Sequence, residues 1–134
     1  MYKWDIFERY QNSFSIIIMD IDDFKEVNDT YGHDCGDYIL KQIAALLKKN
    51  IRKQDVVARW GGEEFLFLLP DTEIEGAFNL AKKLNRVINE RVYKYKNNKI
   101  EISITMGISE YNKKIPFYEC VIKADKAMYK GKKG

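Results

Sequence analysis

Stretches of apolar residues along the chain predict four β-strands. The stretch 14–21 holds a continuous apolar run, which is typical of a central strand buried on both faces. Two further apolar runs, 55–60 and 64–69, flank Gly61-Gly62 and predict a β-hairpin whose turn uses residues that tolerate a positive φ. Alternation of apolar and polar residues over 100–109 predicts a strand with one buried face.

Apolar residues at helical spacing predict helices before, between and after these strands. A short helix is expected at 4–11, and longer helices from about 37 to 50, from 72 to 92 and from Pro116 onward. Their apolar stripes are expected to face the core rather than a cofactor. The stripes consist of Ile39, Ile43 and Leu47; Ile74, Ala77, Phe78, Ala81, Leu84, Ile88 and Val92; and Phe117, Val121, Ala124 and Met128.

The order of the predicted elements indicates the fold class. A strand, two helices, a hairpin, a helix, a strand and a final helix imply a mixed central β-sheet flanked by helices, which is an α+β fold. Local residue patterns mark the expected boundaries of these elements. They are breaks at Gly32 and Gly36, a turn over 95–99, and capping boxes formed by Asp23 with Glu26 and by Thr72 with Glu75.

Composition and charge narrow the class of protein. The 134 residues are 46% hydrophobic and 32% charged, as expected for one globular domain with a real core. A net charge of +3 is too small to indicate a nucleic-acid-binding protein. No apolar run reaches the length of a membrane helix, and no signal-peptide pattern opens the chain. Cys35 and Cys120 lack metal-ligand spacing, so we expect free thiols and a cytoplasmic location.

Two groups of carboxylates are candidates for chemistry. The first strand ends in Asp20-Ile21-Asp22-Asp23, and carboxylates at the end of a buried strand are costly unless they are paired or bind metal. Glu63 and Glu64 follow the glycines of the hairpin. If the strand and the hairpin are neighbours, Asp20 and Glu63 converge on one divalent ion, and oxygen ligands favour Mg²⁺ or Mn²⁺. Taken alone, the hairpin favours the alternative of a solvated acidic tip.

Several ordered motifs carry a resemblance to a known family. Gly61-Gly62-Glu63-Glu64-Phe65 follows Asp20-Ile21-Asp22-Asp23-Phe24-Lys25 and Asn28-Asp29-Thr30-Tyr31-Gly32-His33, and Ala124-Asp125-Lys126-Ala127-Met128-Tyr129 lies near the end. The whole chain, 1–134, resembles a single GGDEF domain of the diguanylate cyclase family. The resemblance implies a fold similar to the palm of nucleotide cyclases and polymerases, with a ferredoxin-like core. It also implies that two GTP are condensed into cyclic di-GMP with release of two pyrophosphates.

The resemblance implies roles for residues at the matching positions. Metal ligands would be Asp20, the carbonyl of Ile21, and Glu63, and Glu63 would also be the general base. Glu64, Gly61 and Gly62 would support the site, whereas Asp22 and Asp23 are better explained as charges at a helix start. Lys25 would stabilise charge on the phosphates. The implied substrate contacts are Phe24, Asn28, His33, Asp37 and Lys132, with Asn28 and Asp37 reading guanine.

Most of these positions have a simpler structural explanation. Lys25 could be a solvated surface lysine, Asn28 part of a helix-ending turn, and Asp37 a helix cap. Arg52 and Asp55 match the family's RxxD inhibitory site, where cyclic di-GMP binds, but they could equally form an incidental ion pair at a turn. The offset of this motif from the glycines favours the inhibitory site.

Two family motifs are absent from this sequence. An opening Asp-x-Leu-Thr-Gly-Leu-x-Asn-Arg segment is missing, and the terminal Gly-Arg-Asn does not follow Gly134. We therefore expect a domain from a longer protein with an upstream sensory module, and a weakly active fragment. The leading hypothesis is a diguanylate cyclase that works as a homodimer. The alternatives are a non-catalytic receptor for cyclic di-GMP or GTP and a module that dimerises its parent protein.

Overall fold

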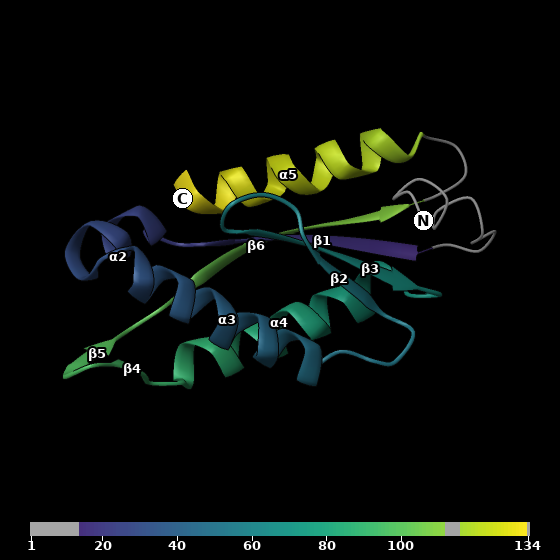
Figure 1. Cartoon of the computed structure of the whole chain (residues 1–134). Coiled ribbons are helices and arrows are strands. Elements are labelled where there is room, and N and C mark those ends of the chain that lie inside the picture. Colours follow the sequence, from purple (N-terminus) through teal and green to yellow (C-terminus); the bar gives the residue numbers. More distant parts are fainter. Residues whose placement is uncertain (1–13, 112–115, 134) are drawn as a thin grey trace.

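The computed structural model describes residues 14–111 and 116–133. The predicted helix at 4–11 lies outside the described residues. The elements follow one another along the chain as drawn in Figure 1. They are β1 (Phe14–Ile21), α2 (Phe24–Tyr31), α3 (His33–Lys49), β2 (Val56–Arg59), β3 (Glu64–Pro70), α4 (Ile74–Glu90), β4 (Tyr93–Tyr95), β5 (Asn98–Ile100), β6 (Ile104–Tyr111) and α5 (Phe117–Lys133).

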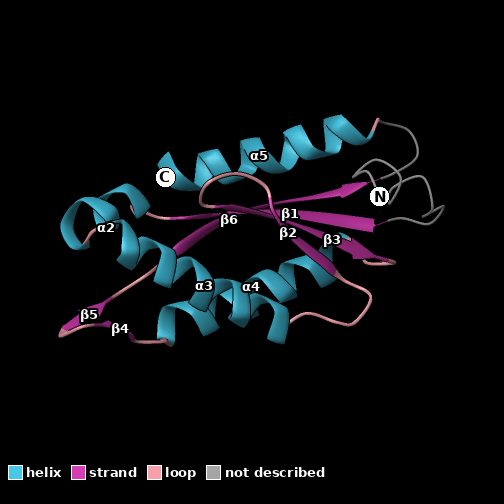
Figure 2. Ribbon diagram, viewed as in Figure 1, coloured by secondary structure: helices cyan, strands magenta, loops and turns pink. Residues whose placement is uncertain are grey.

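A four-stranded sheet with the order β2-β3-β1-β6 forms the centre of the domain. β1 pairs with β3 on one side and with β6 on the other (Figure 2). The predicted α+β class is confirmed, but every pair of neighbours in this sheet is antiparallel rather than mixed. The reason is that α2 and α3 lead from β1 to the outer strand β2, and the hairpin then returns β3 into the place beside β1.

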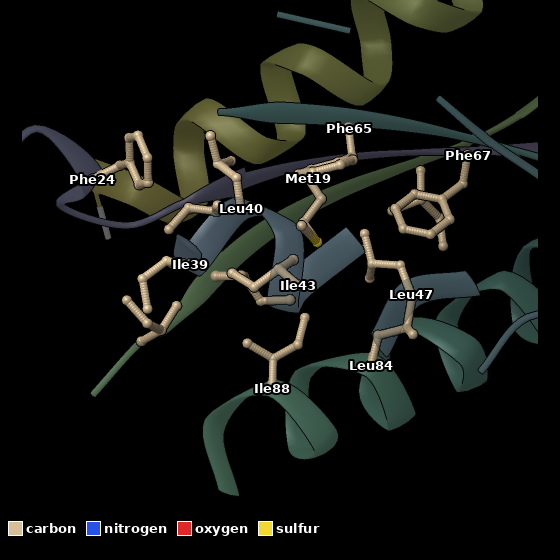
Figure 3. Close-up of a cluster of buried hydrophobic side chains, with 14 of the residues drawn as sticks. Met19, Phe24, Ile39, Leu40, Ile43, Leu47, Phe65, Phe67, Leu84 and Ile88 are labelled. Carbon is tan, nitrogen blue, oxygen red and sulfur yellow. The ribbon is translucent and has the colours of Figure 1, made fainter. Parts of the chain in front are cut away.

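Helices cover both faces of the sheet. α3 and α4 lie on one face and α5 on the other (Figure 1). Successive side chains of β1 point to opposite faces of the sheet. Ile17 and Met19 therefore join the core between the sheet and helices α3 and α4, whereas Ile16 and Ile18 join the core between the sheet and α5. This is why the apolar run of β1 shows no alternation, as predicted. Figure 3 shows the larger cluster, in which Met19 meets side chains from α3, β3 and α4.

The second face of the sheet depends on a close approach of α5 to β6. A Cβ on Gly107 would lie 1.8 Å from the carbonyl oxygen of Ala124, so a glycine is required there. Gly107 and Ser109 are buried against this helix. The prediction of one buried face for 100–109 is therefore wrong, because α5 covers the face that was expected to be polar.

The structure differs from the predicted helices and strands in three places. α3 begins at His33, with Gly36 inside the helix rather than at a break. α4 ends at Glu90, so Val92 lies beyond it. Three residues of the predicted apolar stripe, Ile74, Phe78 and Val92, are exposed rather than in the core. The segment over 93–100 forms the β4–β5 hairpin, which lies apart from the central sheet. Its two strands are three residues long, too short for a periodic pattern.

Neither predicted capping box forms. The side chains of Asp23 and Glu73, which precede α2 and α4, make no capping hydrogen bond. Thr72 instead donates its hydroxyl to the carbonyl oxygen of Pro70. The first turn of α4 is satisfied from another element, because the backbone N–H of Ile74 donates to the carboxylate of Glu110 over 2.6 Å. A partner distant in the sequence thus replaces the local cap.

Candidate active site

The two groups of carboxylates meet where β1 ends and β3 begins. Asp20 lies directly opposite Glu64 in the antiparallel register. The backbone N–H of Ile21 donates to the carbonyl oxygen of Glu63 over 3.3 Å, which holds the hairpin connection against the end of β1. The strand adjacency that the sequence argument required is therefore present.

The hairpin connection is held by hydrogen bonds rather than by unusual glycine conformations. Among the described residues, Gly32 is the one glycine at positive φ, so the tolerance of Gly61 and Gly62 for a positive φ is not used in this turn. The guanidinium of Arg59 donates to the carbonyl oxygen of Gly61 over 3.3 Å and to that of Gly62 over 2.9 Å. A Cβ on Gly62 would meet no atom within 4 Å. The backbone at this tip is therefore open to a ligand.

A lysine from α5 lies among the carboxylates. Lys132 Nζ lies 3.0 Å from Asp20 Oδ2 and 3.3 Å from Asp22 Oδ1. The other carboxylate oxygen of Asp20, Oδ1, is buried and has no hydrogen-bond partner. Burial raises the pKa of Glu64, and the nearby charges of Asp20, Asp125 and Glu63 raise it further. The site therefore holds more negative charge than Lys132 alone balances.

Asp22 connects this cluster to β6. Its carboxylate accepts hydrogen bonds from Ser103 Oγ at 2.8 Å and from Thr105 Oγ1 at 2.6 Å. Partial burial alone would raise the pKa of Asp22, but the hydrogen bonds from Thr105 and Ser103 together with Lys132 lower it. The interpretation of Asp22 as a charge at a helix start is wrong, since its side chain points to the sheet. The sequence pattern does not predict this role for Ser103 and Thr105, because they alternate with apolar residues on the face expected to be polar.

The donor set fits a hard divalent cation. Asp20, the carbonyl of Ile21, and Glu63 would all offer oxygen ligands, and the unpartnered Oδ1 of Asp20 is the observation that favours a further cation here. Within 14–111 and 116–133, no three His, Cys, Asp or Glu side chains form a metal-binding group. A cation at this place would therefore complete its shell with the Ile21 carbonyl, phosphate oxygens or water.

A pocket of about 320 Å³ lies between α3 and the hairpin strands. Asp37 and Lys41 from α3 line it together with Arg59 and Phe65 from the hairpin. Successive side chains of a strand point to opposite faces, so Phe65 faces this pocket whereas Glu64 lies on the other face of β3, toward Asp20 and Asp125. Its floor is apolar. It is formed by Leu40, Ala44, Leu47, Val57 and Phe65.

The other predicted substrate residues lie on α2 and at the start of α3. Phe24 is buried, Asn28 is half-buried, and Lys25 and His33 are exposed. A Cβ on Gly36 would lie 1.9 Å from Asn28 Oδ1, so the Asn28 side chain packs directly on the backbone of α3. The side chain of Asn28 and the exposed Asp37 are thus presented by two consecutive helices.

Arg52 and Asp55 form a separate cluster where α3 leads into β2. Arg52 Nη2 lies 2.8 Å from Asp55 Oδ1, and Arg52 Nε donates to Asp55 Oδ2 over 3.1 Å. The same guanidinium donates to Thr72 Oγ1 and to the carbonyl oxygen of Pro70. The side chain of Asp55 is 1% exposed and that of Arg52 is 49% exposed. The pair therefore joins this turn to the end of β3, beside a pocket of about 310 Å³.

An antiparallel sheet with helices on both faces, and carboxylates at the meeting point of its two inner strands, defines a palm-like α+β domain. A family model described as "Diguanylate cyclase, GGDEF domain" matches residues 2–134. The chain belongs to this family. The predicted family resemblance is thereby confirmed.

Known proteins similar to this chain include cyclases from three bacteria. It is 37% identical to diguanylate cyclase A of Treponema denticola, over 91% of this chain and 33% of that protein. The active GGEEF domain of a diguanylate cyclase from Vibrio cholerae superposes with a TM-score of 0.86 at 32% identity, covering 97% of this chain and 83% of that one. SiaD of Pseudomonas aeruginosa, solved with its activator SiaC, gives 0.89 at 31% identity, covering 96% and 50%.

The chain spans about a third of the length of its Treponema denticola relative. No helix in the described part of the chain is long and apolar enough to cross a membrane.

Proposed function

We propose that this chain is a diguanylate cyclase domain that condenses two GTP into cyclic di-GMP. The observation that carries the proposal is the acidic cluster at the end of β1, in which Asp20 keeps a buried oxygen without a partner beside an open glycine backbone. Such a site suits a cation that bridges carboxylates to phosphates. Membership of the family and the similarity to cyclases support the same reaction.

In the proposed reaction the 3′-hydroxyl oxygen of one GTP attacks the α-phosphorus of the other. A new P–O bond forms, the bond from the α-phosphorus to the oxygen bridging the β-phosphorus breaks, and pyrophosphate leaves. The carboxylate of Glu63 takes the hydroxyl proton as general base. Asp20, the Ile21 carbonyl and Glu63 would hold a bound Mg²⁺ or Mn²⁺. The ion would lower the pKa of the attacking hydroxyl and neutralise negative charge on the triphosphate. Lys25 and Lys132 would stabilise charge on the leaving pyrophosphate.

Base selectivity is assigned to Asn28 and Asp37. A carboxylate can accept hydrogen bonds from both N1–H and the amino group of guanine, an edge that adenine lacks. Asp37 lines the pocket between α3 and the hairpin strands, and Asn28 is held against Gly36 of the same helix. The ring of Phe24 packs near Gly36, and His33 begins α3 and is exposed.

The product requires two such sites to face each other. One chain offers one acidic cluster and one proposed guanine-reading carboxylate, Asp37, so we propose that catalysis takes place in a homodimer with one GTP per chain. We also propose an upstream sensory domain in a longer cytoplasmic parent protein, because the chain spans a third of its Treponema denticola relative.

Feedback by the product is a second proposal. Arg52 is half exposed beside the pocket next to Asp55, and its remaining donor capacity could bind a guanine edge or a phosphate of cyclic di-GMP. Bound product would cross-link two domains so that their GTP sites cannot meet. We favour this over a shift of the hairpin strands, which would work against a packed sheet.

The test is incubation with GTP and Mg²⁺ at high protein concentration, followed by nucleotide chromatography. Cyclic di-GMP and pyrophosphate should appear together, and ATP should give no product. A chain that binds cyclic di-GMP but makes none would contradict the cyclase and favour the receptor. Omission of the divalent ion is the matched control, and undiminished turnover without it would exclude the proposed metal role.

A further inference from the structure

The ion pairs of Lys132 place this lysine between a carboxylate assigned to the metal and a carboxylate that has other partners. Its ammonium group lies 3.0 Å from Asp20 Oδ2 and 3.3 Å from Asp22 Oδ1. Asp22 accepts from two hydroxyl donors, Ser103 just before β6 and Thr105 on it, and its backbone N–H donates to the carbonyl oxygen of Ser103 over 3.0 Å. Asp20 Oδ1 has none. The two carboxylates therefore share one lysine, but Asp22 has other hydrogen-bond donors whereas Asp20 Oδ1 has none.

We propose that Lys132 is the resident counter-cation of Asp20, that a divalent cation displaces it from Asp20, and that Asp22 then keeps it beside the phosphates. Asp22 is thus a positioning residue that acts through Lys132. The inference rests on the proposed metal role of Asp20.

Electrostatics gives the direction of the exchange. A divalent ion on Asp20 would repel the ammonium group that now lies against the same carboxylate, since like charges a few ångströms apart interact strongly in a partly buried site. The side chain of Asp20 is 13% exposed and that of Lys132 is 27% exposed, so water screens the repulsion only in part. Asp22 is anchored by Ser103, just before β6, and by Thr105 on β6, and does not need to move.

The first test measures Mn²⁺ binding to the nucleotide-free chain by electron paramagnetic resonance of the free ion. Lys132→Met should bind Mn²⁺ about fivefold more tightly than the wild type, because the competing cation is gone and a partly exposed ion pair is worth up to about 1 kcal/mol. Lys132→Arg keeps a cation and should bind as the wild type does. Lys130→Met removes an exposed lysine from the same helix and should also change nothing.

Equal Mn²⁺ affinity of the wild type and Lys132→Met would overturn the exchange while leaving the cyclase proposal intact. Equal tightening by Lys132→Met and Lys132→Arg would overturn it too, since the effect would then be steric. If neither the wild type nor Lys132→Met binds Mn²⁺, the metal assignment of Asp20 fails, and this inference fails with it. Circular dichroism spectra that match the wild type establish that each variant is folded.

The second test is a double-mutant cycle of Asp22 and Lys132. Calorimetry measures the affinity of each variant for a non-hydrolysable GTP analogue in the presence of Mn²⁺. Asp22→Asn keeps the size of the side chain and should weaken binding about fivefold when Lys132 is present. In the Lys132→Met background the same substitution should have almost no effect, because its action passes through the lysine. Additive effects of the two substitutions would overturn the positioning role of Asp22.

Discussion

Substitution of Gly36 by alanine separates the stability of the fold from its recognition of guanine. The new Cβ would lie 1.9 Å from Asn28 Oδ1 and 3.1 Å from a ring carbon of Phe24. Asn28 must therefore swing away, since the helix backbone of α3 cannot yield as easily as the end of a side chain. Alanine in the interior of a helix is favoured over glycine by about 1 kcal/mol, which offsets part of the strain. We expect the free energy of unfolding to change by less than about 1 kcal/mol.

Recognition should change much more than stability. A displaced Asn28 no longer offers its amide to the guanine edge, and the loss of a hydrogen bond to a buried ligand group costs about 1–3 kcal/mol. This corresponds to a decrease in GTP affinity of roughly fivefold to 150-fold. ATP affinity, which does not use this edge, should remain as it is in the wild type. The ratio of the two affinities is therefore the quantity that decides.

Calorimetry with GTP and with ATP, together with thermal unfolding, measures both effects. Gly76→Ala is the matched control, because Gly76 is an exposed glycine of α4 whose added Cβ would meet only a methyl group of Thr72. This control should keep the wild-type preference for GTP. If Gly36→Ala prefers GTP as strongly as the wild type, Asn28 does not read guanine. If Gly36→Ala unfolds the chain, the gain in helix propensity does not compensate the steric strain, and the expected stability is wrong.

Three further predictions concern single residues. Glu63→Gln should lower turnover roughly 10²-fold or more without unfolding the chain, since a metal ligand and the general base are lost together, and unchanged turnover would refute the assignment. Asp37→Ala should weaken GTP binding by about 1–3 kcal/mol in calorimetry, whereas equal binding of GTP and ATP by the wild type would show that Asp37 does not read guanine. Arg52→Ala should lose at least about 1.5 kcal/mol of cyclic di-GMP binding and keep the initial rate of GTP turnover. Its free energy of unfolding should be lower by about 1–3 kcal/mol, because the buried Asp55 loses its partner. Progress curves with added product and chemical denaturation measure these effects, and undiminished product inhibition would show that the feedback site lies elsewhere.

The sequence was informative wherever a pattern is set by neighbours along the chain. The continuous apolar run of β1 predicted a strand buried on both faces, and the glycine hairpin predicted the pairing of β2 with β3. Together they implied that Asp20 would meet the hairpin, and the register places it opposite Glu64. Period and order were sufficient for these features because each depends on local geometry.

Features that depend on distant partners could not be predicted. Asp22 has the sequence of a helix start, yet its side chain bonds to Ser103 and Thr105 more than eighty positions away. The contact of Lys132 with Asp20 depends on how α5 packs on the sheet, and the helix approaches β6 closely at Gly107. No periodicity in α5 reports that approach. Tertiary packing overrides the local signal in both cases.

The arrangement of the sheet also determines when the site can be assembled during folding. β1 is one of the two inner strands but lies first among the described elements, and its partner β6 follows almost at the other end. Contacts between segments so far apart close large loops, which makes folding slow. Until β3 and β6 arrive, the run from Ile16 to Met19 is an unpaired segment of high β-propensity with no charge to interrupt it. The strand that carries Asp20 is therefore the segment most exposed to misassembly while the chain is still folding.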